Sequence, residues 1–256
     1  MKTINEMKNT VLSVIQKNVN NDYLSEDLNE KVVVITGASK GIGLATANIL
    51  YKQGAKLVLV SKNLKDLKKA FADFNTDKTL LISANVANEE NVKDLVRKTN
   101  KKFGKIDVLI NNAGVNIHKH LEETKLSEAE ELLYTNILGP FLMCKHIIPI
   151  MKKHQSGTII NVGSKISRNA KVTPKKVLYA TSKHALEGFS QALNNELKKY
   201  KIRVTCLMPG TVNTFITKKA MSYLSPYRVG EIIAMIIKFH DVDFENFVIK
   251  SVHQDI

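Results

Sequence analysis

The sequence has 256 residues, of which 44% are hydrophobic and 24% are charged, so its composition is that of an ordinary globular protein. Its formal net charge of +14 suggests a nucleic-acid function, but lysines are spread over nearly every predicted helix, and no zinc-finger, helix-turn-helix or RNP pattern occurs. We therefore expect no nucleic-acid partner and, because no apolar run is long enough to span a bilayer, no membrane partner.

Residues 1–30 form an extension before the first predicted strand. Apolar residues recur at helical spacing between Ile4 and Val19, which predicts an amphipathic helix that ends in the Asn-rich stretch 18–22. The apolar face of this helix needs a surface to cover. That surface belongs to its own subunit, to a subunit interface or to a partner.

Strands alternate with helices in the rest of the chain, which is the pattern of right-handed βαβ units and a parallel sheet. The predicted strands are residues 32–35, 56–60, 79–83, 105–110, 157–163, 202–207 and 247–250. The predicted helices are residues 44–50, 64–74, 88–103, 127–151, 177–200 and 226–239, and the fourth is either continuous or kinked near Pro140. The sequence predicts an α/β fold, a Rossmann-like doubly wound parallel sheet of about seven strands with helices on both faces, in a three-layer sandwich.

A glycine-rich turn joins the first predicted strand to its helix. Gly37, Gly41 and Gly43 follow a β-branched run and directly precede helical periodicity. Glycines allow a sharp turn and expose backbone N–H groups, which suit a phosphate when a helix begins there. The alternative is a tight βα connection that binds no ligand.

Tyr179 and Lys183 are four residues apart and therefore share one helix face. A phenol with a pKa of about 10 is a poor acid–base catalyst at neutral pH, and a neighbouring ammonium would favour its ionised form. The alternative is an ordinary ion–dipole pair on the surface of a helix.

Further motifs occur around this pair in a fixed order. They are Thr36-Gly-Ala-Ser-Lys-Gly-Ile-Gly43, Asn111-Asn-Ala-Gly114, Asn136, Ser164, Tyr179, Lys183 and Pro209-Gly-Thr-Val-Asn-Thr214. Together, over roughly residues 30–250, they resemble the short-chain dehydrogenase/reductase family, and in particular its single-domain oxidoreductases. The resemblance implies that residues 31–256 form a single dinucleotide-binding catalytic domain.

The resemblance also implies catalytic roles. Tyr179 would be the acid–base residue, and Lys183 would hold the cofactor ribose and lower the pKa of Tyr179. Ser164 would hydrogen-bond the reacting carbonyl oxygen, and Asn136 would organise a proton-relay water near Lys183. Two alternatives stay open: Asn136 could simply bridge helix turns, and Ser167 competes with Ser164.

Cofactor-binding residues follow from the same resemblance. The set is Gly37, Ser39, Lys40, Gly41, Ile42, Gly43, Lys62, Asn85, Val86, Asn112, Ala113, Gly114, Tyr179, Lys183, Pro209, Gly210, Val212 and Thr214. Asn85 stands where the family usually has an acidic residue that contacts adenine. Segments 111–114 and 209–214 have a simpler alternative, in which they only turn the chain.

The expected cofactor is NADP(H) rather than NAD(H). NAD-specific sites place an acid after the second strand to bind the ribose 2′-OH, whereas a 2′-phosphate needs cations. Here that strand ends in Val60-Ser-Lys-Asn63 without an acid, and Lys40 precedes Gly41. We predict that Lys62 and Lys40 favour the 2′-phosphate.

These residues predict an NADPH-dependent carbonyl reductase or alcohol dehydrogenase with a small carbonyl or alcohol substrate. The alternative is a cofactor-binding scaffold or regulatory protein on the same fold that catalyses nothing. Segment 165–176 carries five cations and no acid, so the substrate is expected to be anionic unless these side chains are only solvated surface.

Cys144 and Cys206 lie far apart without a C-x-x-C motif, so neither a disulfide framework nor a metal site is predicted. The first residues lack the continuous apolar segment of an export signal. We therefore expect a cytoplasmic protein. Members of the family that it resembles are usually dimers or tetramers, so we expect a homodimer or homotetramer, with the extension packed within it.

Overall fold

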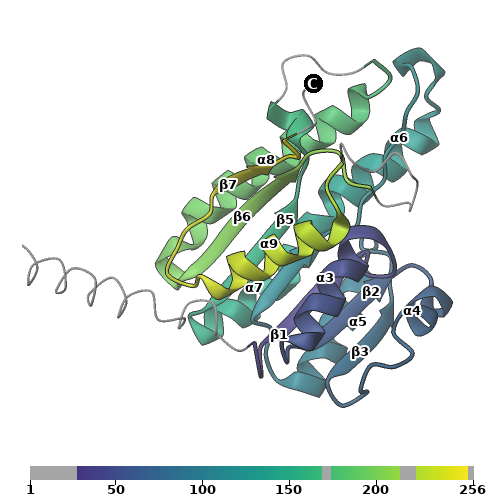
Figure 1. The fold of residues 1–256 in the computed structure, drawn as a ribbon. Helices are drawn as coiled ribbons and strands as arrows, with labels where there is room; N and C mark the ends of the chain where they lie inside the picture. Colours follow the sequence, from purple (N-terminus) through teal and green to yellow (C-terminus); the bar gives the residue numbers. More distant parts are fainter. Residues whose placement is uncertain (1–27, 169–173, 214–222, 253–256) are drawn as a thin grey trace, which may run out of the picture.

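The computed structural model describes residues 28–168, 174–213 and 223–252 (Figure 1). Seven strands form one parallel sheet in the order β3-β2-β1-β4-β5-β6-β7. They are β1 (Val32–Thr36), β2 (Lys56–Ser61), β3 (Thr79–Ser83), β4 (Val108–Asn111), β5 (Gly157–Val162), β6 (Ile202–Pro209) and β7 (Asn246–Ile249). The order reverses between β1 and β4, where a doubly wound sheet opens a crevice beyond the strand ends. The predicted fold class is confirmed.

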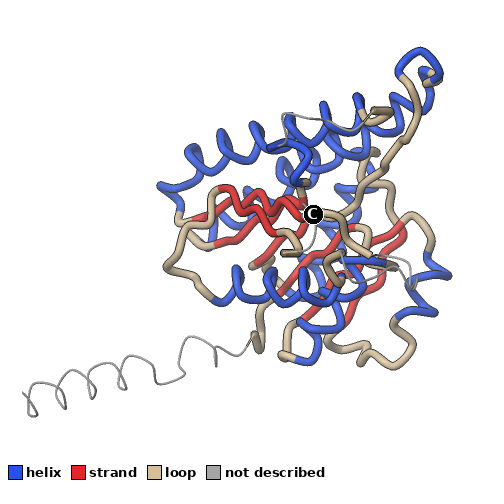
Figure 2. The backbone as a smooth tube through the Cα atoms, turned by 45° about the horizontal axis from the view of Figure 1, so that its top comes forward, coloured by secondary structure: helices blue, strands red, loops and turns tan. Residues whose placement is uncertain are grey.

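Helices cover both faces of the sheet, which makes three layers (Figures 1 and 2). The helices are α3 (Gly41–Lys52), α4 (Leu64–Ala70), α5 (Glu89–Phe103), α6 (Leu126–Leu133), α7 (Gly139–His154), α8 (Val177–Leu197) and α9 (Pro226–Lys238). The core cluster on one face contains side chains of α3, α4 and α9, and the cluster on the other face contains side chains of α5, α7 and α8.

Strand β1 shows why the sheet is buried on both sides. All of its residues are buried, and Val33 and Ile35 belong to one core cluster while Val32 and Val34 belong to the other. Successive side chains of a strand point to opposite faces, so an unbroken β-branched run fills both layers.

A polar ladder ties the strand ends at the crevice to α8. Asn111 of β4 is paired in register with Asn161 of β5, and its Nδ2 donates to Asn161 Oδ1 at 2.8 Å. Asn161 Nδ2 in turn donates to Ser190 Oγ on α8 at 2.9 Å. These buried amides are satisfied by each other, so they fix α8 against the ends of β4 and β5.

The predicted helix 127–151 is not one regular helix. It consists of α6, a π-helical turn η2 (Tyr134–Leu138) and α7. Pro140 has no N–H to donate to the carbonyl of Asn136, so the α-helical hydrogen-bond ladder cannot continue through this point. Of the two predicted alternatives, a continuous α-helix is wrong, and the interruption near Pro140 is a π-helical turn just before the proline.

Several predicted boundaries were also wrong. The helix predicted at 64–74 ends at Ala70, and the Phe74 ring stacks on Tyr51 with ring centroids 3.8 Å apart. The strand predicted from residue 105 begins at Val108, since the Asp107 carboxylate accepts a hydrogen bond from the Val32 backbone at 2.7 Å. The helix predicted to reach residue 200 leaves α-helical geometry after Leu197 and closes with a 3-10 turn.

The helix predicted between Ile4 and Val19 lies outside the described residues. Leu28, which the sequence-based division assigns to the extension, is buried in the core, and its N–H donates to the Gln53 carbonyl at 3.2 Å. No helix within the described ranges is long and apolar enough to cross a membrane.

Candidate active site

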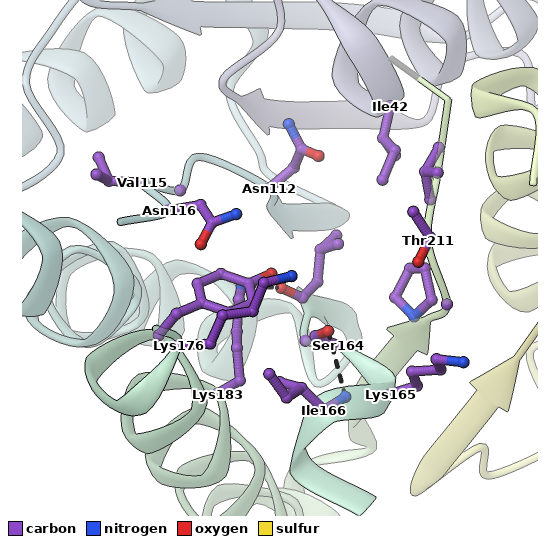
Figure 3. Close-up of a pocket in the computed structure, with 17 residues that line it drawn as sticks. Ile42, Asn112, Val115, Asn116, Ser164, Lys165, Ile166, Lys176, Lys183 and Thr211 are labelled. Atoms are coloured by element: carbon purple, nitrogen blue, oxygen red, sulfur yellow. Dashed lines mark hydrogen bonds between the residues drawn. The ribbon is translucent and has the colours of Figure 1, made fainter. Parts of the chain in front are cut away.

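Two neighbouring cavities lie beyond the strand ends at the crevice. Cavity A, of about 470 Å³, is lined by residues that follow β4, β5 and β6 and by the start of α8 (Figure 3). Cavity B, of about 320 Å³, is lined by the glycine turn, the ends of β2 and β3, and α6. Gly114 and Val115 line both cavities, so the two are adjoining parts of one crevice.

Packing within the chain explains two glycines of the turn. Gly37 has φ +64°, and a Cβ there would lie 2.9 Å from Ala113 Cα. A Cβ on Gly43 would lie 2.4 Å from the Gly37 carbonyl oxygen. The alternative of a tight βα connection therefore accounts for these two residues without any ligand.

The start of α3 carries the better indication of a phosphate. Its N-cap, Lys40, makes no side-chain capping hydrogen bond, and the first turn contains no acid. The first N–H groups of the helix are thus left for a ligand. Ile42 lines cavity A, whereas Ser39 and Lys40 line cavity B, so this helix start separates the two cavities.

Asn112 closes the floor of the crevice. Its Nδ2 donates to the carbonyls of Thr36 and Gly37 at 2.9 and 3.1 Å. Thr36 Oγ1 accepts from the backbone N–H groups of Asn112 and Ala113, both at 3.0 Å. The segment after β4 thus turns the chain, as its alternative interpretation expects, and it also lines cavity A through Asn112.

Lys183 is not part of an ordinary surface pair, because it is buried at the back of cavity A. Its Nζ donates to the Val162 carbonyl at 2.8 Å and lies 5.7 Å from the centroid of the Tyr179 ring. Burial lowers the pKa of Lys183 to about 8. The side chain therefore stays mostly protonated at neutral pH although it is buried.

Tyr179 and Ser164 meet in the same cavity. Burial raises the pKa of the Tyr179 phenol, and a hydrogen bond with the Ser164 hydroxyl opposes that rise. The sequence predicts a lowered pKa for Tyr179, so this direction is opposite to expectation. The pKa rises because burial disfavours the phenolate more than the neighbouring polar groups stabilise it. Ser167 is turned away from the cavity: its hydroxyl donates to the Ser164 carbonyl at 3.0 Å.

Asn136 lies in the π-helical turn with its side chain buried and fully engaged. Its Oδ1 accepts from the Val115 N–H at 2.8 Å, and its Nδ2 donates to the Val115 carbonyl and to Ser182 Oγ at 2.9 and 3.1 Å. The side chain thus fastens the loop after β4 to α8 rather than bridging helix turns. A Cβ on Gly114 would lie 3.4 Å from Asn136 Oδ1 and 3.9 Å from Lys183 Nζ, so Gly114 sits between them.

Cavity B contains acids that the sequence analysis did not identify. Lys40 and Lys62 line it together with Asp66 and Glu131, and Lys62 Nζ lies 3.2 Å from Glu131 Oε1. The acids were missed because neither directly follows β2: Asp66 lies in α4, and Glu131 comes from α6, 69 residues beyond Lys62.

The remaining predicted cofactor residues divide into three groups. Pro209, Gly210 and Val212 line cavity A, and Val86 lines cavity B. Asn85 does not line either cavity, and its Oδ1 accepts from the Ala87 N–H at 3.2 Å. Thr214 lies outside the described residues.

The five cations of segment 165–176 do not form one cluster. Lys165 and Lys176 line cavity A, whereas Arg168 pairs with Glu187 at 2.6 Å. Lys175 is exposed, and Lys171 lies outside the described residues. Asn116, which the sequence analysis did not single out, also lines cavity A.

Within the described ranges, no group of three or more His, Cys, Asp or Glu side chains is arranged to hold a metal ion.

Comparison with known proteins agrees with this geometry. The family model for short chain dehydrogenases matches residues 31–224. The 3-oxoacyl-[acyl-carrier-protein] reductase of Bos taurus is 36% identical over 189 residues, which are 74% of this chain and 78% of the relative. An uncharacterized oxidoreductase of Staphylococcus saprophyticus is 37% identical over 73% of this chain and 81% of its own. The X-ray structure of an alcohol dehydrogenase from the archaeon Thermococcus sibiricus, complexed with 5-hydroxy-NADP, has a TM-score of 0.80 at 29% identity, with 88% of this chain and 98% of that chain covered.

Proposed function

The chain belongs to the short-chain dehydrogenase family of NAD(P)-dependent oxidoreductases, and from that premise we propose that it interconverts a carbonyl compound and its alcohol in cavity A, with Tyr179 as the acid–base residue. The carrying observation is that Tyr179, Ser164 and Lys183 come together in one cavity, where the ammonium is buried.

The buried ammonium argues against the alternative of a scaffold that catalyses nothing. Removing a charge from water is costly, and the lowered pKa of Lys183 reflects that cost. A protein that only binds a cofactor could use this cation to hold the ribose, but it has no need for a phenol and a serine hydroxyl beside it. A catalyst needs both, because negative charge develops on the phenol when its proton leaves.

Tyr179 donates its proton to the carbonyl oxygen in the direction of reduction. With its pKa raised, the phenol is protonated at neutral pH and holds the proton that reduction requires. A weak acid gives up its proton reluctantly, so the neighbouring groups must stabilise the phenolate. Ser164 hydrogen-bonds the same carbonyl oxygen, and Lys183 stabilises the phenolate that remains. The bound nicotinamide supplies the hydride in reduction and accepts it in oxidation.

Asn136 positions these groups. Its side chain holds the loop at Val115, which lines cavity A, against Ser182 of the helix that carries Tyr179 and Lys183. The Asn136 carbonyl cannot accept a hydrogen bond from Pro140, and we assign to it the water that relays protons near Lys183.

The residues of the crevice fit a dinucleotide. The N–H groups at the start of α3 suit the phosphates, and the residues that line cavity A suit the nicotinamide half. Lys40 and Lys62 of cavity B suit a 2′-phosphate. We propose NADP(H) as the preferred cofactor. Because Asp66 and Glu131 share cavity B, the preference over NAD(H) is moderate.

The test is NADPH consumption by the full chain with a panel of aldehydes and ketones, run beside the Tyr179→Phe variant and with NADH as the second cofactor. Turnover of a ketone by the wild type that is lost in Tyr179→Phe supports the proposal. Tight NADPH binding without turnover of any carbonyl compound would instead support the scaffold.

A further inference from the structure

One of the lysines that line cavity A has no role in the proposed chemistry. Three lysines line it, Lys165, Lys176 and Lys183, and no acid is among the described residues that line it. Lys183 is committed to the Val162 carbonyl. In the view of Figure 3, Lys176 and Lys183 are drawn toward the same side of the cavity, whereas the Lys165 side chain extends away on the other. Lys176 is thus the cation that remains for a ligand.

Lys176 differs from Lys119 and Arg168, two cations on neighbouring segments. Lys119 pairs with Glu128 at 2.6 Å, and Arg168 pairs with Glu187 at 2.6 Å. In the parts of the chain that the structure describes, the half-buried Lys176 has no carboxylate partner. A half-buried ammonium beside a cavity without acids favours an anion there.

The backbone holds Lys176 in place. Lys175 has φ +69°, a left-handed conformation that is unfavourable for a residue with a Cβ, and its carbonyl accepts from the Lys119 N–H at 3.0 Å. The Lys176 carbonyl accepts from the Ala180 N–H at 2.8 Å, which makes Lys176 the N-cap of α8. The position of Lys176 is therefore fixed relative to Tyr179, one helical turn later.

This short separation limits the ligand. Lys176 precedes Tyr179 by three residues and lines the same cavity, so an anion held by Lys176 lies only a few bonds from a carbonyl that contacts Tyr179. A single unpaired ammonium matches a single negative charge. The phosphates of a coenzyme A or acyl-carrier thioester lie far along the carrier arm from the carbonyl.

We propose that Lys176 binds a carboxylate on the substrate, so that the proposed reductase acts on short oxo acids, or on the corresponding hydroxy acids in the reverse direction. Asn116, exposed on the same cavity wall, is placed to donate a second hydrogen bond from its amide. The inference rests on the proposed function, because that function places the reacting carbonyl beside Tyr179. It adds which group of the substrate is bound, and it leaves the reaction itself unchanged.

The test compares a charged probe with a neutral one of nearly the same shape: 3-oxobutanoate and its methyl ester, with NADPH and the full chain. Lys176→Met removes the charge and keeps the length, and Lys176→Arg restores a cation. Lys69→Met, on α4, is the matched control because it lowers the net charge equally at an exposed residue that lines neither cavity.

We expect Lys176→Met to lower kcat/KM for 3-oxobutanoate about 10- to 100-fold, mainly through KM, which is the loss that one charged hydrogen bond gives. The methyl ester should change less than about twofold, Lys176→Arg should recover most of the loss, and Lys69→Met should match the wild type. Equal losses for both probes, or no loss for either, would overturn the assignment.

Two further measurements distinguish a carboxylate site at Lys176 from the proposed catalytic function and from a site for carrier phosphates. Calorimetric titration of the NADP⁺-loaded protein with 3-oxobutanoate measures binding without turnover, because the oxidised cofactor has no hydride to transfer. Failure of the wild type to bind the acid overturns the inference even if neutral ketones are reduced. Binding of the acid that is lost in Lys176→Met, with no carbonyl turned over, contradicts only the proposed function. A larger loss for 3-oxobutanoyl-coenzyme A than for the free acid would move the anion site to the carrier phosphates, against the proposal.

Discussion

Cavities A and B adjoin at Gly114 and Val115 but differ in how their charges are balanced. Cavity A has lysines and no acid among its described lining, whereas the two lysines of cavity B share its lining with two acids. Lys62 is paired with Glu131, both side chains more than half exposed, so its charge is partly neutralised before any ligand arrives. Lysine therefore adds positive charge that no described lining acid balances in cavity A, and partly neutralised charge in cavity B.

The difference extends to how firmly the groups are held. Lys183 and Asn136 beside cavity A are buried and bonded to backbone carbonyls, whereas the Lys62–Glu131 pair of cavity B is solvent-exposed. Buried, bonded groups are suited to chemistry that needs fixed geometry. Exposed pairs tune affinity by smaller amounts, since water screens them. We expect substitutions in cavity A to have larger effects on turnover than substitutions in cavity B.

Tyr179→Phe should have the largest effect. The substitution keeps the ring and removes the proton donor, so kcat should fall at least about 100-fold while the Kd for NADPH stays nearly unchanged. Steady-state kinetics and a fluorescence titration with NADPH measure the two quantities. Retained turnover would show that the chemistry does not depend on Tyr179.

Ser164→Ala should be severe, but less so than Tyr179→Phe. Removing one hydrogen-bond donor to the carbonyl oxygen should lower kcat about 30-fold, since water or the backbone can replace part of the donation. Ser167→Ala is the matched control, because its hydroxyl bonds to the Ser164 carbonyl and does not line the cavity. A larger loss in the control than in Ser164→Ala would exchange the two roles.

Lys62→Asp tests cavity B. Placing an acid at the end of β2, beside Asp66 and Glu131, should weaken NADPH binding about tenfold and leave NADH nearly unaffected. Glu131→Gln should do the reverse and strengthen NADPH binding a few-fold, because Lys62 is then released from its pair. Equal changes in the Kd of both cofactors would mean that cavity B does not receive the 2′-phosphate.

The smallest expected effect concerns the stability of the free protein. The pKa of Lys183, about 8 in the folded state, lies below its usual value of 10.5, so between these pH values the unfolded chain binds more protons. The folded state should therefore gain stability as pH rises through this window, by about 2 kcal/mol relative to a Lys183→Met variant without the group. Urea unfolding of both proteins from pH 7 to 10 measures the difference, and parallel curves would contradict the burial of the charge.

The parts of the site that are local in sequence could be predicted, and those that depend on packing could not. The unbroken apolar run of β1 and the alternation of elements were sufficient for a parallel sheet, and Tyr179 and Lys183 are joined by helical spacing alone. Two other contacts join segments that are distant in sequence. They are the ion pair of Lys62 with Glu131 and the hydrogen bonds between Asn136 and Val115. The pKa of Tyr179 is raised rather than lowered. Helical spacing indicates the neighbouring cation, but it does not show that the phenol is buried.

The most direct test of hydride transfer in cavity A uses NADPH deuterated at nicotinamide C4 and a ketone that the protein consumes. If cavity A holds a reductase, mass spectrometry should find one deuterium at the carbinol carbon of the alcohol, and the label should be absent from the same reaction with Tyr179→Phe. NADPH that binds without producing labelled alcohol from any ketone of the panel would contradict the account and identify the protein as a cofactor-binding scaffold.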